Sequence, residues 1–324
     1  MTVRRRRVLV VGARGFIGRA VLDVLIDQGH EVSTMRGPRL PPMPACAAES
    51  FIATSALIDD LREEFTGVDA VVNTAGNPDA SETDGEALVS PNGILPGLLA
   101  AVCQEAEPSP RLVHVSSAVV QGRSPVLDAS RETDGFSVYA RSKILGETLV
   151  LERAPDIAVV YRPPSVHAVD RRVTRMTARV ARSPLSTVAR PGSSPSPQAL
   201  LANVASAVAF LATCPQQPPS VVAHPSEGLT TAGVMRALGG RPPRELPRRV
   251  ARAAVSIANG AGRLSPAAAA NARRMEMLWF GQAQACSWLT EAGWSPPQGE
   301  GAWAELGHEI SRTQTVISRG REIR

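Results

Sequence analysis

The stretch Arg7-Val8-Leu9-Val10-Val11-Gly12-Ala13-Arg14-Gly15-Phe16-Ile17-Gly18 decides the fold class of this chain. Residues 7–11 form a short apolar run of the kind found in buried strands, and a glycine-rich segment follows at once. Beyond it, apolar residues recur at helical spacing as far as Gly29, namely Ala20, Val21, Val24 and Leu25. This pattern predicts a strand, a tight turn and a helix in that order.

The glycines at positions 12, 15 and 18 indicate a binding role for the turn. Glycine permits a tight turn and lets backbone N–H groups approach a pyrophosphate at the helix N-terminus. The first gap is one residue longer than in G-x-G-x-x-G, but the predicted strand and helix supply the context that such a motif requires. We therefore predict a dinucleotide-binding turn with the candidate residues Gly12, Arg14, Gly15, Phe16, Ile17 and Gly18. The alternative is a plain turn between a strand and a helix.

Lys143 is the only lysine among the 35 Lys and Arg residues of the chain. It follows Tyr139, one of only two tyrosines, at the i+4 position, so a helix would place both side chains on one face. An ammonium is a compact charge whose pKa can shift, whereas a guanidinium is a broad, permanently charged fork. A site that must lower the pKa of a phenol and also bind a sugar hydroxyl can require the ammonium. The alternative is a chance pair on a solvated helix.

With these two segments the chain resembles the extended short-chain dehydrogenase/reductase superfamily, the group called NAD-dependent epimerases and dehydratases. The resemblance is dense over residues 7–165 and also rests on segments 67–76, 113–122, 139–147 and 161–164. The residues that match the family's catalytic positions are Ser117, Tyr139 and Lys143. Those that match its cofactor contacts in these segments are Ala75, Gly76, Lys143 and Pro163. Gln121 replaces an aromatic residue that the family usually has there.

The resemblance implies hydride transfer between a carbon that bears oxygen and a nicotinamide ring. Tyr139 would deliver a proton to the substrate oxygen, and Ser117 would donate a hydrogen bond to the same oxygen. Lys143 would favour the phenolate form of Tyr139 and bind the nicotinamide ribose. The alternatives are a Ser117 that only ends a strand and a Tyr139 that only packs on its helix.

Charge at the end of the second predicted strand, Glu31–Met35, favours NADP over NAD. Relatives that prefer NAD carry an acidic residue there, which binds the ribose 2′-hydroxyl. Here the position holds Arg36, and Arg14 and Arg39 are near, so guanidiniums are available for a 2′-phosphate. The alternative for Arg36 is an ordinary surface arginine, and NAD is the second candidate cofactor.

Three segments narrow the reaction. Ala118 and Val119 follow Ser117 where sugar 4,6-dehydratases of the family carry an Asp-Glu pair, so dehydration is not expected. Residues 195–204 contain no arginine, whereas nucleotide-sugar members carry one there for the diphosphate. The closing segments 246–252 and 288–296 resemble dihydroflavonol-reductase-like and 3β-hydroxysteroid-dehydrogenase-like members, whose substrates are apolar. We expect an NADPH-dependent ketoreductase acting on a small or apolar carbonyl or alcohol. The alternatives are a nucleotide-sugar epimerase and, third, a non-catalytic NADP-binding protein.

The alternation of strand and helix patterns in the first half predicts an α/β fold with a Rossmann-type doubly wound parallel sheet. Further strands are expected at Glu31–Met35 and 51–53, and helices at 59–65, 86–105 and 139–153. Prolines and short helical patterns after Pro164 predict a smaller, mostly helical C-terminal substrate lobe. The expected domains are 1–165, which binds NAD(P), and 166–324, which binds substrate, with residues 220–224 returning to the sheet. Residues 192–197 are expected to form a flexible connector.

Composition argues against several other classes of protein. With 324 residues, 44% hydrophobic and 20% charged, the chain can bury one large α/β core and a smaller lobe. No apolar run is long enough to span a membrane, so no membrane partner is expected. The apolar run after Arg4 to Arg7 is too short for a signal peptide. Four separated cysteines without a Cys-x-x-Cys pair predict a cytoplasmic protein without a metal site.

The net charge of +5 raises the question of a nucleic-acid partner. We expect none, because aromatic residues make up only 4% of the chain and the basic residues are dispersed. The basic clusters at 171–175 and 241–252 are either solvated faces or a mouth that attracts an anionic cofactor or substrate. The expected partner is a small-molecule substrate, and the sequence is compatible with a homodimer.

Overall fold

The computed structural model describes residues 4–80, 82–262 and 266–322. The chain forms two compact units, each with its own hydrophobic core. The first unit comprises Met1–Pro164, Ala202–Pro225 and Cys286–Ser295, and the second comprises Ser165–Leu201, Ser226–Ala285 and Pro296–Arg324. The chain therefore leaves the first unit next to the boundary expected at residue 165, but it returns to that unit twice.

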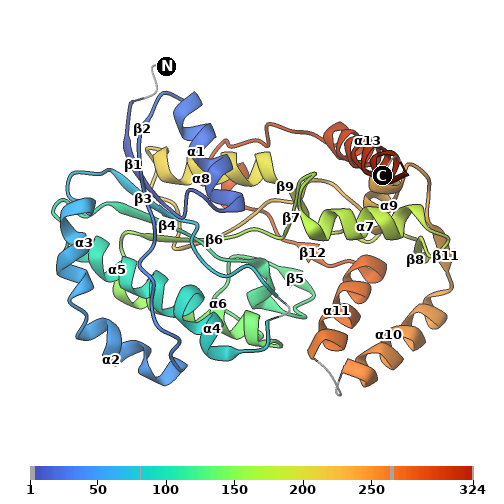
Figure 1. The fold of residues 1–324 in the computed structure, drawn as a ribbon, viewed down its shortest axis with the longest axis horizontal. Coiled ribbons are helices and arrows are strands. Elements are labelled where there is room, and N and C mark those ends of the chain that lie inside the picture. The colour runs from blue at the N-terminus through green and yellow to red at the C-terminus, as the bar shows by residue number, and fades with distance from the viewer. Residues whose placement is uncertain (1–3, 81, 263–265, 323–324) are drawn as a thin grey trace. The chain divides into compact units, whose positions relative to one another are not determined.

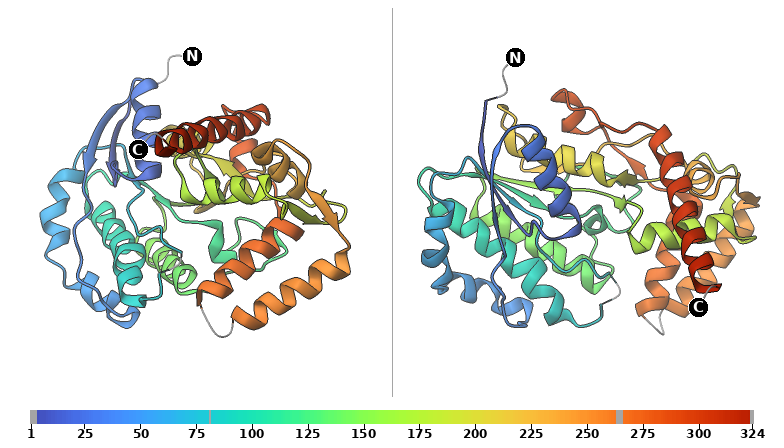
Figure 2. Two further views of the ribbon diagram at one scale, coloured as in Figure 1. Left: turned by 45° about the vertical axis from the view of Figure 1, so that its right-hand side comes forward. Right: turned by 45° about the horizontal axis from the view of Figure 1, so that its top comes forward.

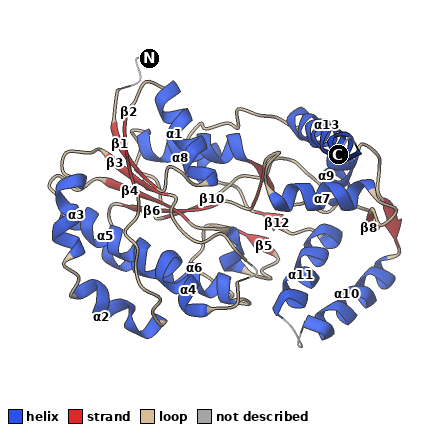
Figure 3. Ribbon diagram, in the orientation of Figure 1, coloured by secondary structure: helices blue, strands red, loops and turns tan. Residues whose placement is uncertain are grey.

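The first unit is built on a six-stranded parallel sheet, which confirms the predicted Rossmann-type fold (Figure 1, Figure 3). The strands are β1 (Arg7–Val11), β2 (Glu31–Met35), β3 (Ala70–Asn73), β4 (Arg111–Val115), β6 (Ala158–Arg162) and β10 (Val221–Ala223). Their order in the sheet is β10-β6-β4-β3-β1-β2. The chain thus proceeds in opposite directions on the two sides of β1. Sheets of this kind bind ligands at such a reversal, outside the carboxyl ends of the strands.

Helices cover both faces of this sheet. In Figure 1, α1 (Phe16–Asp27) and α8 (Leu201–Thr213) lie on one face, and α3 (Leu57–Phe65), α5 (Leu95–Glu105) and α6 (Val138–Arg153) lie on the other. The unit also contains η1 (Ala45–Ala47), α2 (Ala48–Ala53), η3 (Ala118–Gln121), β5 (Val126–Leu127) and α12 (Trp288–Glu291). Side chains from the sheet and from α3, α5 and α6 meet in one core, where Leu9, Phe65, Leu99 and Val150 are buried.

A long apolar helical stretch, Gly85–Glu105, packs into this core. It consists of α4 (Gly85–Val89), a π-helix η2 (Ser90–Ile94) and α5, where the sequence predicts one uninterrupted helix over 86–105. Pro91 lies inside η2, and proline cannot make the hydrogen bond of a regular helix interior. By length and composition the stretch could cross a membrane, but 78% of its apolar window is buried within the fold.

The strand expected at residues 51–53 is wrong, because these residues end helix α2. Ala48 and Ile52 are one helical turn apart, and both are buried in a cluster with Leu98 and Leu149. A three-residue apolar run does not distinguish a short strand from a buried helical turn. The strand expected at residues 220–224 is present, since Val221–Ala223 forms β10 and pairs in parallel with β6.

The second unit is mostly helical. Its elements are β7 (Ser165–His167), α7 (Arg172–Arg182), β8 (Thr187–Ala189), β9 (Gln198–Leu200), α9 (Thr231–Gly239), β11 (Arg244–Leu246), α10 (Arg248–Gly262), α11 (Pro266–Phe280), β12 (Ala283–Gln284) and α13 (Gly301–Glu322). β7 pairs in parallel with β9, and β8 with β11. Figure 2 shows α13 beside α7 and α9. Trp303, Leu306 and Ile310 of α13 are buried in the core of this unit.

Residues 192–197 do not form the flexible connector that the sequence predicts. Ser196 N donates a hydrogen bond to Leu229 O over 2.9 Å, and Thr231 N donates to Ser194 O over 2.9 Å. Ser196 is buried as well. These backbone bonds fix the segment within the second unit.

Candidate active site

The glycine turn joins β1 to α1, as the sequence predicts. Gly12 has a φ of 86°, and Gly15 N donates a hydrogen bond to Gly12 O over 2.8 Å. Gly18 is buried against the turn, where a Cβ would lie 2.2 Å from Gly12 O. Any side chain at position 18 would therefore push α1 away from β1. No side chain caps the N-terminus of α1, and its first turn contains no acid, so an anion would be accepted there.

A cleft of about 960 Å³ opens beside the glycine turn. It is walled by the turn, by residues 34–40 at and beyond the end of β2, and by residues 74–77 after β3, with part of α4 and η2. Of the predicted cofactor residues, those that line it are Gly12, Arg14, Gly15, Arg36, Ala75 and Gly76. The cleft therefore lies at the carboxyl ends of β1, β2 and β3, where the strand order reverses. Its size and its glycine-rich turn fit a dinucleotide.

Three exposed arginines line the cleft: Arg14 in the glycine turn, and Arg36 and Arg39 after β2. The lining residues between 34 and 42 include no acid. Guanidiniums bind phosphate oxygens in a bidentate manner, whereas a carboxylate would repel them. This end of the cleft therefore suits a phosphorylated ribose.

Lys143 is buried on α6, with only 6% of its surface exposed. Its ammonium lies behind Gly76 of the cleft wall, because a Cβ on Gly76 would be 3.4 Å from Lys143 Nζ. Burial lowers the pKa of Lys143 from 10.5 to about 8, and the nearby carboxylate of Glu147 opposes this shift. The only lysine of the chain thus lies next to the cleft in surroundings that make its charge adjustable.

Tyr139 and Lys143 are one turn apart on α6 and share a face of the helix. Ser137 caps this helix, since its Oγ accepts a hydrogen bond from Ala140 N over 3.0 Å. Ser117 lies between β4 and η3, and its Oγ accepts from Val119 N over 3.2 Å. A serine hydroxyl that accepts in this way can still donate its own hydrogen to a ligand.

Several predicted site residues are not part of the cleft lining: Phe16, Ile17, Gly18, Ser117, Tyr139, Lys143 and Pro163. Phe16 and Ile17 begin α1, and Gly18 acts through close packing. Pro163 is buried, and its carbonyl accepts a hydrogen bond from Ala118 N over 2.9 Å. Pro163 thereby ties the end of β6 to the residue after Ser117.

Asn92 is a buried polar residue that the sequence analysis missed. Its Oδ1 accepts from Asn77 N over 2.9 Å, and its Nδ2 donates to Asn77 O over 3.1 Å. Nδ2 also donates to Ser142 Oγ on α6 over 3.1 Å. Asn92 therefore connects the loop under the cleft to the helix of Lys143. The signal in the sequence is Pro91-Asn92-Gly93, which interrupts an apolar helical pattern, and π-helices of this kind are frequent at functional sites.

His114 is a second buried group near Lys143. Its Nδ1 lies 3.2 Å from Asn73 Nδ2 on the neighbouring strand β3. Burial and the positive charge of Lys143 lower the pKa of His114 well below its ordinary value, so its ring is neutral near pH 7. If Nδ1 accepts from the amide, the ring hydrogen is on Nε2.

Residues 8–192 match the NAD dependent epimerase/dehydratase family. The chain belongs to this family. It is 28% identical over 165 residues to dTDP-4-dehydrorhamnose reductase of Mycolicibacterium smegmatis, covering 49% of this chain and 46% of that protein. It is 31% identical over 163 residues to a probable low-salt glycan biosynthesis reductase of Haloferax volcanii, covering 47% and 51%. The chain thus spans about half the length of the curated relatives it matches.

The fold is shared with a human epimerase family protein solved with NADPH. The TM-score is 0.63 at 21% identity, over 93% of this chain and 99% of that one. The family match over residues 8–192 confirms the predicted family, and this structure shows the shared fold. None of these three proteins is named as a dihydroflavonol reductase or a steroid dehydrogenase, so the finer likeness of the closing segments stays a prediction.

Proposed function

We propose that this chain is an NADPH-dependent reductase that acts on the carbonyl group of a nucleotide-linked sugar. The observation that carries the proposal is the burial of Lys143 behind Gly76, one helical turn from Tyr139, beside a cleft that fits a dinucleotide. The names of the two curated relatives, both reductases, support the reaction type.

The relatives do not support the small or apolar substrate that the sequence analysis expects. Their names specify a dTDP-linked sugar or a glycan. The absence of an arginine from residues 195–204 still affects how a nucleotide-linked substrate could bind. Residues 195–204 contain no Lys or Arg, and Gln198 in that segment is a neutral, buried side chain whose Oε1 lies 2.7 Å from His167 Nε2. Another cation must then meet the diphosphate of a nucleotide-linked substrate.

In the proposed reaction, bound NADPH supplies the hydride. Tyr139 delivers the proton that the substrate oxygen takes up. Ser117 donates a hydrogen bond to that oxygen and orients it. Lys143, while charged, stabilises the phenolate form of Tyr139 that remains after proton transfer. Its ammonium also donates a hydrogen bond to a ribose hydroxyl of the cofactor. Arg14 and Arg36 would bind the 2′-phosphate.

An epimerase is the second candidate, since the matched family includes epimerases. An epimerase would use the same side chains for a transient oxidation. It would also retain its cofactor through purification and consume no net NADPH.

The test is NADPH consumption with three substrates: dTDP-4-dehydrorhamnose, a free keto sugar and an apolar ketone. We expect turnover with the dTDP-linked sugar. Tyr139→Phe should reduce this turnover by about 10²–10⁴-fold while NADPH binding is retained. Turnover of the apolar ketone alone would instead support the small or apolar substrate that the sequence analysis expects. Isomerisation of a nucleotide sugar without net NADPH consumption would identify an epimerase, and no NADPH-dependent turnover at all would refute the reductase.

A further inference from the structure

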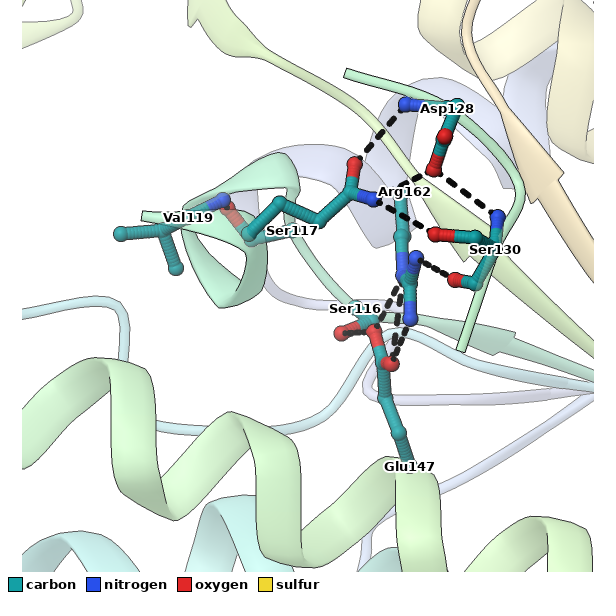
Figure 4. Close-up of polar contacts among 8 residues, drawn as sticks. Ser116, Ser117, Val119, Asp128, Ser130, Glu147 and Arg162 are labelled. Atoms are coloured by element: carbon teal, nitrogen blue, oxygen red, sulfur yellow. Dashed lines mark hydrogen bonds and ion pairs between the residues drawn. The ribbon is translucent and has the colours of Figure 1, made fainter. Parts of the chain in front are cut away.

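Six polar residues next to Ser117 form one network of hydrogen bonds (Figure 4): Ser116, Gln121, Asp128, Ser130, Glu147 and Arg162. They come from the end of β4, from η3, from the loop after β5, from α6 and from the end of β6. We propose that this network positions the catalytic side chains by holding Ser117 and Lys143 in a fixed relation. The inference rests on the proposed function, because it assigns positioning residues to that reaction.

The centre of the network is the buried ion pair between Glu147 and Arg162. Arg162 Nη2 lies 2.6 Å from Glu147 Oε2, and Arg162 Nε lies 3.1 Å and 3.2 Å from the two carboxylate oxygens. The two side chains are 4% and 1% exposed. Glu147 Oε1 also accepts from Ser116 Oγ over 2.5 Å. One carboxylate therefore connects α6 to the ends of both β4 and β6.

The two residues joined by the Ser116–Glu147 hydrogen bond each lie close in the chain to a proposed catalytic residue. Ser116 directly precedes Ser117, and Glu147 follows Lys143 by one helical turn. A movement of the Glu147 carboxylate would therefore displace Ser117 and Lys143 relative to each other. Arg162 restricts that movement because it holds both carboxylate oxygens.

Arg162 also extends the network to the loop that precedes Tyr139. Its Nη1 donates to Ser130 O over 2.6 Å. Gln121 makes two hydrogen bonds to Asp128 in the same loop. Its Nε2 donates to Asp128 Oδ1 over 2.6 Å, and its Oε1 accepts from Asp128 N over 2.9 Å. An aromatic side chain at position 121 could not make this pair of bonds. The two bonds to Asp128 therefore explain why this chain has glutamine there.

The ion pair also controls the charges around Lys143. Lys143 faces Tyr139 and Glu147 on its own helix and the neutral His114 on β4. The Glu147 carboxylate favours the charged ammonium. The positive charge of Arg162, which binds the same carboxylate, should act in the opposite direction. Removal of the carboxylate should therefore lower the pKa of Lys143, whereas removal of Arg162 should raise it.

The lone lysine allows a direct test in the protein without cofactor. Isotope-labelled lysine, in a chain with a lysine-free tag, gives one side-chain NMR signal whose pH titration reports Lys143 alone. The variants are Glu147→Gln, Arg162→Met and the double variant. The matched control is Glu49→Gln with Arg153→Met, because Arg153 of α6 forms an ion pair with the exposed Glu49, and that pair is far less buried than the pair of Glu147 and Arg162.

We expect the Lys143 midpoint to fall in Glu147→Gln and to rise in Arg162→Met. In both variants kcat should fall by about 10²-fold, with a smaller change in KM, because the catalytic groups are displaced. The control pair should change neither quantity. If Arg162→Met does not fold, the double variant replaces it, because it leaves no unpaired buried charge.

Two results would overturn the proposal. One is a folded double variant with wild-type kcat, and the other is a Lys143 midpoint that none of the variants moves. If the wild type reduces no substrate while the midpoints shift in opposite directions, the proposed reaction fails but the assignment of the network to Lys143 stands.

Discussion

Lys143 Nζ lies 3.4 Å from the point where a Cβ on Gly76 would stand. Asn92 Oδ1 lies 2.7 Å from the same point. Buried polar groups from α6 and η2 therefore meet behind one residue of the cleft wall, and they can do so because that residue has no side chain.

Gly76→Ala should weaken NADPH binding. Its Cβ must displace Asn92 Oδ1, and the φ of 154° at this position is rarely adopted by residues with a side chain. Local strain of about 1–3 kcal/mol corresponds to a loss of affinity of about 5-fold to 150-fold, measurable as a Kd by fluorescence titration. Gly85→Ala is the control, because its Cβ would first meet Val138 Cγ1 at an ordinary 3.7 Å. Equal affinity in Gly76→Ala and the wild type would remove Gly76 from the site.

Lys143→Met should stabilise the protein without cofactor at pH 7. The pKa of Lys143 falls from 10.5 to about 8 on folding, so the unfolded chain holds this proton more tightly. The buried charge therefore costs stability below pH 8, by about 3 kcal/mol, and the cost disappears as the pH rises from about 8 to 10.5. Denaturant unfolding at several pH values measures the difference in free energy of unfolding. A variant that is less stable than the wild type at pH 7, or a pH-independent difference, would contradict the burial of a charged lysine.

Arg36→Asp should narrow or reverse the cofactor preference. Wild-type protein should show a higher kcat/KM with NADPH than with NADH, because guanidiniums rather than carboxylates line the end of the cleft at β2. Arg14→Asp and Arg39→Asp serve as matched comparisons. Equal kcat/KM for both cofactors in the wild type would refute the 2′-phosphate argument. If a strong preference for NADPH survives in Arg36→Asp, the 2′-phosphate must be bound by Arg14 or Arg39 instead.

The parts of the fold that follow local patterns could be predicted from the sequence. β2 has the predicted bounds Glu31–Met35, and α6 begins one residue before the predicted 139. Both predictions rest on short local stretches, because β2 follows the helical pattern that ends at Gly29, and α6 contains Tyr139 and Lys143 at helical spacing. The glycine turn is local as well, because the close packing of Gly18 on Gly12 occurs within one strand–turn–helix unit.

The parts that depend on tertiary packing could not be predicted. Ile52 is buried by a helical turn that packs on α5, so residues 51–53 form a helix end in place of the strand that their apolar run predicts. Asn92 contacts the loop at Asn77 and Ser142 of α6 only because η2 docks against α6, and its residue type does not predict this. The contact between Glu147 and Ser116 joins positions that are far apart in the chain, and neither residue type reveals it.

The turnover of Lys143→Arg tests the central claim most directly. Every other basic residue in the chain outside histidine is an arginine, yet this position is buried and only 6% exposed. A guanidinium is larger, and its pKa is too high to adjust, so it should displace the groups behind Gly76. We predict a kcat lower by about 10²-fold or more, weaker NADPH binding and a shift of the alkaline limb of the pH–rate profile to higher pH. Near-wild-type turnover in a Lys143→Arg variant with an unchanged melting temperature would contradict the account, because the lone lysine would then be an accident of composition.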